Sequence, residues 1–379
     1  LLNPGSYLPT PVDLTIDFTS DMDYRVAGSV TGTGTNGAFL TVGGVVLSGS
    51  AEFALSRYDR DIGTVTGGTL DTWAFNVNEA GVAVDNLTLT VSGTLGLANV
   101  NDQGGTAIYT AINMGDVNVT AGADSDLFGL TGNVTIDYYH SNSAANGYDR
   151  LDWTTAFADG ALLNPGSYLP TPVDLTIDFT SDMDYRVAGS VTGTGQVGDP
   201  GEGNNNPADN ALLTIDDLQI TGSAEFALSK WDVDIDNDPN TNETLNSYAL
   251  TVTNAGLVTT DFNLTISGKL GMAKVTDNAT TYTAITMGDV DVTTNAVSGD
   301  FGLDGQLTID SLDINKVSAG DRLDWTTAFD FDGDGQHDLL NPGADLPIPA
   351  DLTINLTSDL QHRITGTVTG TGQVGDPGE

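Results

Sequence analysis

The chain has no cysteine, few basic residues and few aromatic residues. Without cysteine it forms no disulfide bond and offers no thiolate for catalysis or metal binding. Only 11 lysines and arginines stand against 52 aspartates and glutamates in 379 residues, so the formal charge is −41. A field of this sign repels nucleic acids and anionic membrane surfaces, and it attracts divalent cations. We therefore set nucleic acid aside as a partner and expect bound cations.

Long apolar runs and catalytic motifs are also missing. No stretch approaches the roughly 18 apolar residues of a membrane-spanning helix, so no transmembrane segment is expected. The chain has no H-E-x-x-H, G-x-S-x-G or Walker motif, and its three histidines lie at unrelated repeat positions. We expect no enzyme, no catalytic residue and no organic cofactor. No signal peptide opens the chain, but residue 1 begins a repeated block, so we expect a window from a longer protein.

The dominant pattern is a long internal repeat. The stretch LLNPGSYLPTPVDLTIDFTSDMDYRVAGSVTGTG occupies residues 1–34 (block 1) and recurs letter for letter at 162–195 (block 2). A diverged copy begins at residue 339 (block 3). Repeats of this length predict domain-sized modules or several turns of a solenoid. The predicted domains are unit 1 (1–161), unit 2 (162–338) and the start of unit 3 (339–379).

Strict alternation of apolar and polar residues runs through each unit. In VDLTIDF, Val12, Leu14 and Ile16 share one face, which is typical of a half-buried strand. No window shows a sustained helical period, so the chain is predicted to be all-β. We favour tandem antiparallel β-sandwich-like modules in an elongated rod, with a continuous β-solenoid as the alternative. Bulges or bends are predicted at glycines inside strands, namely Gly49, Gly93, Gly132, Gly222, Gly268 and Gly305.

The repeated block is expected to join neighbouring units. Its proline-punctuated start, NPGSYLPTP, predicts a crossing between units. The chain ends shortly after the third copy, which suggests that each block pairs with strands of the unit before it. In that arrangement neighbouring units interlock.

Residues 330–338 read DFDGDGQHD and carry acids at alternate positions of a short loop. Calcium binds six to eight oxygens at about 2.3–2.6 Å, and alternate residues of a tight loop aim their carboxylates at one centre. Gly335, at the sixth position, permits the sharp turn, and the carbonyl at the seventh completes the ring. Position 12 is Asn341 rather than the glutamate of a helical calcium hand. The predicted calcium ligands are Asp330, Asp332, Asp334, Gln336 and Asp338.

This loop resembles the calcium loop of FG-GAP and related extracellular repeats, whose pattern is D-F-x-G-D-G-x-x-D-L. The matching residues are Asp330, Phe331, Gly333, Asp334, Gly335, Asp338 and Leu339. The resemblance implies that four aspartates of the loop, 330, 332, 334 and 338, bind calcium through their side chains. It covers residues 330–339 alone, and no propeller blades accompany it, so it implies no propeller fold. A solvated acidic loop is the alternative.

The end of unit 1 reads FADGALL at 157–163 and lacks this cluster. We therefore expect the junction of units 2 and 3 to be clamped by calcium at a different angle or rigidity. Other acidic clusters are weaker candidates, because they also fit solvated strand faces or plain polar positions. They are Asp232, Asp234 and Asp236, and the repeated set Asp17, Asp21 and Asp23 with its copies Asp178, Asp182 and Asp184.

The motif RLDWTTAF occurs in both units and contains the repeated tryptophans Trp153 and Trp325. We interpret both as core anchors, with a sugar-stacking platform as the alternative. Arg150 and Arg322 in the same motif are expected to pair with nearby acids, because cations are scarce.

Near-identical long repeats, acidity, lack of cysteine and a calcium loop together resemble giant repetitive bacterial surface proteins, in particular the stalks of RTX-type adhesins. The resemblance implies an extracellular or cell-surface structural protein, a stiff calcium-stabilised rod or fibre for adhesion. A self-assembling sheath, surface-layer or filament subunit is one alternative, and a polysaccharide-binding or -cleaving β-protein is another. Expected partners are neighbouring repeat units, with a homo-oligomer and a cell-surface glycan as further candidates.

Overall fold

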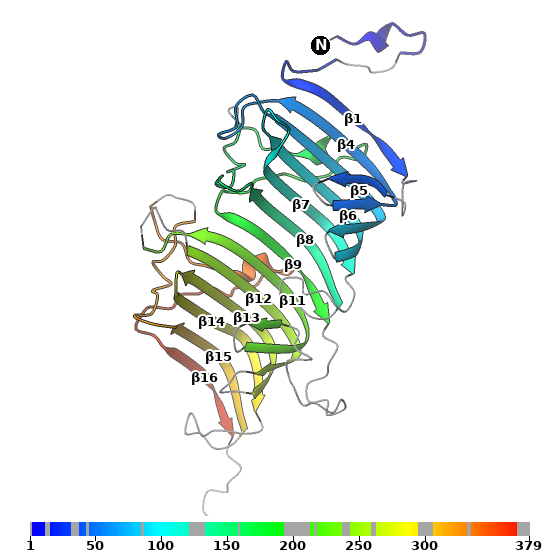
Figure 1. Ribbon diagram of the computed structural model, residues 1–379. Helices are drawn as coiled ribbons and strands as arrows, with labels where there is room; N and C mark the ends of the chain where they lie inside the picture. The colour runs from blue at the N-terminus through cyan, green and yellow to red at the C-terminus, as the bar shows by residue number, and fades with distance from the viewer. Residues whose placement is uncertain are drawn as a thin grey trace, which may run out of the picture.

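A computed structural model shows the fold (Figure 1). It describes residues 2–11, 16–31, 38–42, 45–84, 87–120, 133–157, 160–192, 213–215, 218–236, 243–258, 263–294, 306–331 and 335–369. These residues form strands and short 3₁₀ helices, with no α-helix among them. Accordingly, the described part contains no helix that is long and apolar enough to cross a membrane.

Most strands are long, and together they are rich in Thr and Val, residues that suit a pleated surface. They are β1 (Met22–Thr31), β2 (Ala38–Val42), β3 (Val45–Ser48), β4 (Ser50–Asp59), β5 (Thr69–Val84), β6 (Leu87–Asn101), β7 (Ala107–Thr120), β8 (Asn133–Ala144), β9 (Met183–Thr192), β10 (Leu213–Ile215), β11 (Leu218–Val233), β12 (Glu243–Val258), β13 (Asn263–Asp277), β14 (Thr280–Thr294), β15 (Gln306–Val317) and β16 (His362–Thr369). The 3₁₀ helices are η1 (Pro4–Tyr7), η3 (Pro165–Tyr168) and η6 (Pro342–Asp345).

All described strands belong to one antiparallel sheet. Thirteen of them follow in the order β1-β4-β5-β6-β7-β8-β9-β11-β12-β13-β14-β15-β16, while β2, β3 and β10 pair beside this path. Figure 1 shows them side by side from β1 at one end to β16 at the other. The all-β, antiparallel class is confirmed. Its arrangement as sandwich-like modules in a rod, or as a solenoid, stays a prediction, as does the division into domains.

The three repeated blocks supply β1, β9 and β16. β9 pairs with β8 of unit 1 along one edge and with β11 of unit 2 along the other. β16 pairs with β15, the last described strand of unit 2. The expectation that a block pairs with the unit before it is therefore confirmed for blocks 2 and 3. Through β9, the sheet runs from unit 1 into unit 2 without an edge between them.

Glycines bend the strands where the sequence predicted. Gly93 and Gly268 have φ angles of 131° and 143°, and the ladder changes register beside each of them. The register also shifts at Gly222, and Gly49, with φ 104°, lies between β3 and β4. The remaining two predictions, Gly132 and Gly305, lie outside the described residues.

The segment of block 2 ahead of β9, residues 163–181, forms a strap across one face of the unit 1 sheet. Its Ile177 and Phe179 are 0% and 2% exposed, in a cluster with Trp153 and other unit 1 residues. Leu175 packs with Ala54 of β4 and Ala74 of β5. A Cβ on Gly96 would lie 3.1 Å from the Cβ of Leu175, so glycine permits the close approach.

A buried asparagine fixes the tryptophan under this strap. The Trp153 Nε1–H donates to Asn142 Oδ1 at 3.0 Å. The Nδ2 of Asn142 donates to the carbonyls of Leu151 and Thr180, each at 2.9 Å. Asn142 and Trp153 are both 0% exposed, so these bonds satisfy groups that water does not reach.

Unit 2 repeats this arrangement with Trp325 and Asn315. The Nδ2 of Asn315 donates to the carbonyls of Leu323 and Thr357, each at 3.0 Å. The interpretation of both tryptophans as core anchors is confirmed, because Trp325 is also 0% exposed. In both units the asparagine ties the strap of the next block to the sheet.

Substitution of Asn142 tests this link. Asn142→Ala leaves the Trp153 N–H and two carbonyls buried without partners, each of which costs about 1–3 kcal/mol. We expect urea unfolding to show a loss of at least about 2 kcal/mol. Asn146→Ala, at an exposed position just beyond β8, is the control and should change stability little. Equal effects of the two variants would contradict the role given to Asn142.

Candidate metal-binding groove

An open groove of about 840 Å³ lies where unit 1, block 2 and unit 2 meet. One wall comes from the residues at the end of β8 and just beyond it, and another from the turn into β9. The end of β11 and residues 329–331 complete it. The carboxylates that line it are Asp149, Asp182, Asp184, Asp232, Asp234 and Asp330.

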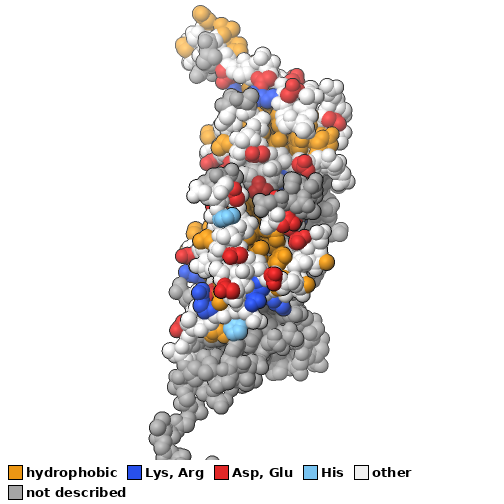
Figure 2. Space-filling view, turned by 90° about the vertical axis from the view of Figure 1, so that its left-hand side faces the viewer, with side chains coloured by type: hydrophobic (Ala, Val, Ile, Leu, Met, Phe, Trp, Pro, Cys, Tyr) orange, Lys and Arg blue, Asp and Glu red, His pale blue; other side chains and the backbone are white. Residues whose placement is uncertain are grey.

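Basic residues balance only part of this charge. Arg150, the one basic residue that lines the groove, contacts Asp232 at 2.5 Å, as expected for an arginine in so acidic a chain. Lys230 contacts Asp184 at 2.8 Å. Within the described residues, no lysine or arginine side chain pairs with the carboxylates of Asp149, Asp182 and Asp330. Figure 2 shows how acidic side chains outnumber basic ones over one face of the molecule.

Three carboxylates gather at the end of β11 and the start of β12. Oxygens of Asp234, Asp236 and Glu243 lie within 4.8 Å of one another. Calcium–oxygen distances of about 2.3–2.6 Å place opposite ligands roughly 5 Å apart, so this triad could hold a divalent cation. Glu243 is 2% exposed, and its Oε2 accepts a hydrogen bond from the Ile235 N–H at 3.1 Å. That bond fixes the carboxylate next to the two aspartates.

Sequence reasoning found two members of the triad and missed the third. Asp234 and Asp236 belong to the alternating run identified as a weaker candidate, whereas Asp232 pairs with Arg150 instead. Glu243 was missed because the segment 237–242 separates it from the run. The available clue was that Val233 and Glu243 would be partners if β11 and β12 formed a hairpin, as the structure shows.

The predicted calcium loop begins at the groove. Phe329 and Asp338 form a bridge that closes its base, with the Asp338 N–H 2.8 Å from the Phe329 carbonyl. The Asp338 carboxylate accepts from the Phe331 N–H at 2.8 Å, and the Asp330 carboxylate accepts from the Gly335 N–H at 2.9 Å. Gln336 is exposed, and Asp332 and Asp334 lie outside the described residues. The ligand set of the loop stays a prediction.

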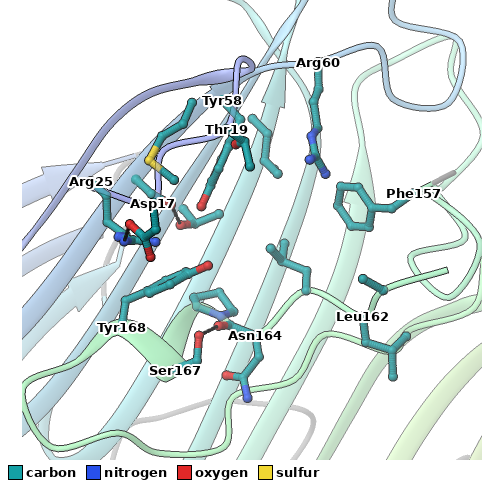
Figure 3. Close-up of a pocket in the computed structure, with 17 residues that line it drawn as sticks. Asp17, Thr19, Arg25, Tyr58, Arg60, Phe157, Leu162, Asn164, Ser167 and Tyr168 are labelled. Atoms are coloured by element: carbon teal, nitrogen blue, oxygen red, sulfur yellow. Dashed lines mark hydrogen bonds and ion pairs between the residues drawn. The ribbon is translucent and has the colours of Figure 1, made fainter. Parts of the chain in front are cut away.

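Unit 1 has a different, charge-balanced site at the equivalent place. There Arg60 contacts Asp21 at 2.5 Å and its guanidinium lies 5.5 Å from the centre of the Phe157 ring. Arg25 contacts Asp17 at 3.0 Å (Figure 3). A hydrogen bond from Thr19, together with Arg60, lowers the pKa of Asp21. Two of the repeated acids thus pair with arginine in unit 1.

The repeat alignment shows what changes in unit 2. Val233 takes the position of Arg60, so one positive charge is lost. Asp236, Glu243 and Asp330 take the positions of uncharged residues in unit 1, namely Gly63, Gly68 and Ala158. Unit 2 therefore concentrates negative charge where unit 1 neutralises it. The other repeated arginine, Arg322, donates to the Leu360 carbonyl at 3.2 Å. A hydrogen bond from Thr357 is the main cause that lowers the pKa of Asp359, and the charge of Arg322 lowers it further.

The comparisons with known proteins gave no relative. No family model matches the chain, and no curated protein or solved structure is significantly similar to it. The chemistry of the groove must therefore be argued from its residues. Carboxylate and carbonyl oxygens are the ligands that hard divalent cations prefer.

The variant Glu243→Gln tests the triad as a calcium site without changing the loop at residues 330–338. The amide oxygen still accepts from the Ile235 N–H, but one of three mutually repelling charges is removed. We expect calorimetric titration to show one fewer calcium per chain, with no loss of stability in chelator. Asp61→Asn, at the unit 1 counterpart of Asp234, is the matched control and should leave the number of calcium ions unchanged. An unaltered titration of the glutamine variant would remove the triad as a site.

Proposed function

We propose that the chain is a structural segment of an extracellular or cell-surface protein, in which repeat units are joined into one continuous scaffold for adhesion. The observation that supports this most is the double role of block 2. Its β9 belongs to the sheets of both units, and its strap covers the core of unit 1. Neighbours that share a strand and a core resist bending and rotation at their junction more than domains on a flexible linker do. The proposal assigns no catalytic residue.

Calcium is proposed as the counter-ion of this scaffold. Self-repulsion of a chain with a formal charge of −41 destabilises its compact state unless ions screen it. The triad and the loop at residues 330–338 offer oxygen ligands beside the junctions of unit 2. A cation bound at either place would neutralise negative charge beside a junction of unit 2. Extracellular fluids hold calcium at concentrations that suit modules with Kd values of about 10⁻⁴–10⁻³ M.

Two polypeptides of equal composition test the shared core. Residues 1–161 and 35–195 contain the same amino acids, because blocks 1 and 2 are identical and only their position differs. The second carries the strap with Leu175, Ile177 and Phe179 after unit 1. We expect it to unfold cooperatively in urea and at higher urea concentration than the first. Equal stability of the two, or greater stability of residues 1–161, would refute the interlocking role of the block.

Removal of calcium tests whether the ion makes the scaffold of repeat units more compact and rigid. In small-angle scattering of the full chain, chelator should raise the radius of gyration through charge repulsion, and added calcium should reverse the change.

Asp332→Ala should weaken the binding of one calcium, since it removes one predicted loop ligand. Asp310→Ala, at an exposed aspartate of β15, is the control. Calcium affinities that are equal for the Asp332 variant and the wild type would reject the loop assignment.

A further inference from the structure

The lysines of this chain all belong to unit 2, and three of the four lie in one row across the sheet. The strand register aligns Lys230 of β11, Lys274 of β13 and Lys316 of β15. Asn246 of β12 and Thr283 of β14 lie between them in the same register. We call these five residues the lysine row. It crosses five neighbouring strands at right angles to their direction (Figure 1).

The lysine row lies on the face of the sheet opposite the strap. Along β13, Lys274 alternates with Ala273 and Val275, which pack with Ile354 and Leu356 of block 3. Successive side chains of a strand point to opposite faces, so Lys274 points away from the strap. Lys316 is exposed, and the other four members of the row are partly exposed. The row is therefore accessible to a ligand in solution.

The corresponding row in unit 1 is neutral. It starts with Arg57 and Asp71, which form an ion pair with contacts of 2.6 and 2.9 Å. Its other members carry no charge, and they are Asn99, Thr110 and Ser143. The formal charge of the unit 1 row is thus zero.

Every charge difference between the two rows adds positive charge to unit 2. Unit 2 has Asn246 for Asp71, Lys274 for Asn99 and Lys316 for Ser143. With Lys230 in place of Arg57, the row rises from zero to a formal charge of +3. This happens in a chain whose net charge is −41.

Neither folding nor solubility explains these lysines. The same sheet accommodates neutral residues at two of the positions in unit 1, so it does not need lysine there. Its excess of acids already keeps the chain in solution. The two acids beside the first lysine are engaged, because Lys230 contacts Asp184 at 2.8 Å and Arg150 contacts Asp232 at 2.5 Å.

The spacing of the row suits an extended polyanion. Neighbouring strands lie about 4.8 Å apart, so successive lysines are about 9.6 Å apart and the five positions span about 19 Å. A linear chain with charges at regular intervals can contact all three ammonium groups at once. Single surface ion pairs are weak, but each contact raises the effective concentration for the next.

The neighbours of the lysines favour a sugar chain over other polyanions. Asn246 and Thr283 offer an amide and a hydroxyl for hydrogen bonds. In the next row inward, Tyr248 is partly exposed between its cross-strand partners Leu228 and Met272. A sugar chain presents hydroxyl groups and apolar C–H faces, which such residues can contact. A bilayer or a nucleic acid duplex is wide enough to meet the surrounding acids, whose field repels it.

We propose that the lysine row binds an acidic polysaccharide, a linear sugar chain with carboxylate or sulfate groups, laid across β11 to β15. This goes beyond the scaffold function, which assigns no ligand to the sheet. The binding uses cations of the protein itself, so it requires no calcium.

The test measures binding of the full chain to labelled oligogalacturonate by fluorescence anisotropy, in chelator so that calcium cannot bridge carboxylates. At about 0.15 M salt the wild type should bind, and added salt should weaken binding. Lys274→Asn with Lys316→Ser introduces the unit 1 residues and should weaken binding about tenfold. If the double variant unfolds, Lys316→Ser alone, at an exposed site, should weaken binding about threefold. Dextran sulfate in place of oligogalacturonate shows whether sulfate or carboxylate binds more tightly.

The control variant is Lys269→Gln, which removes the one lysine outside the row. Lys269 alternates with Gly271, where an added Cβ would lie 3.0 Å from the Cβ of Leu352 in the strap, so it belongs to the other face. Its substitution should leave binding unchanged. Poly-glutamate, which has the charge without the sugar, and neutral dextran, which has the sugar without the charge, should both bind more weakly.

Three results would overturn the proposal. They are failure of both acidic polysaccharides to bind, equal binding by the wild type and the double variant, and binding of poly-glutamate as tight as that of the polysaccharides. In each case the scaffold function would stand, because it depends on β9 and the strap rather than on the lysine row.

Discussion

The structure depends on the cover that each block gives to the sheet before it. An antiparallel sheet of this kind has one face to bury and two edges to protect. In unit 1 the strap of block 2 buries the face over Ala54, and β9 protects the edge of β8. The core of unit 1 is thus closed by residues that the repeat assigns to unit 2. The groove lies at the junction that this overlap creates.

Charge is the second constraint on the molecule. Some of the few basic residues pair with acids inside a unit, as in the two contacts of 2.6 and 2.9 Å between Arg57 and the buried Asp71, and others join two units, as Arg150 does with Asp232. Unit 1 also uses Arg60 beside the strap, but unit 2 has Val233 there and gains carboxylates around it. A charge pattern that changes between two copies of one scaffold points to the places where function differs.

Much of the fold could be predicted from the sequence. The alternation of apolar and polar residues predicted the strands, and glycines inside strands predicted the bulges at Gly93 and Gly268. The repeat predicted that each block pairs with the unit before it. The packing of the strap on the sheet face could not be predicted, because only burial shows that Leu175 lies over Ala54 and Ala74. The role of Asn142 could not be predicted either, because it depends on two carbonyls and an indole N–H that only tertiary packing brings together. Glu243 could be predicted only from the register of the β11–β12 hairpin. The loop of that hairpin has no alternating pattern from which the register could be read.

The central claim is that block 2 is energetically part of unit 1. Native-state hydrogen exchange of the full chain in increasing urea tests this most directly, because it reports which amides open together. The account predicts that the amides of Trp153, Ile177 and β9 open with those of β5 to β8, in one cooperative step. Exchange of Ile177 and β9 in a separate, lower-energy opening, while β5 to β8 stay protected, would contradict it.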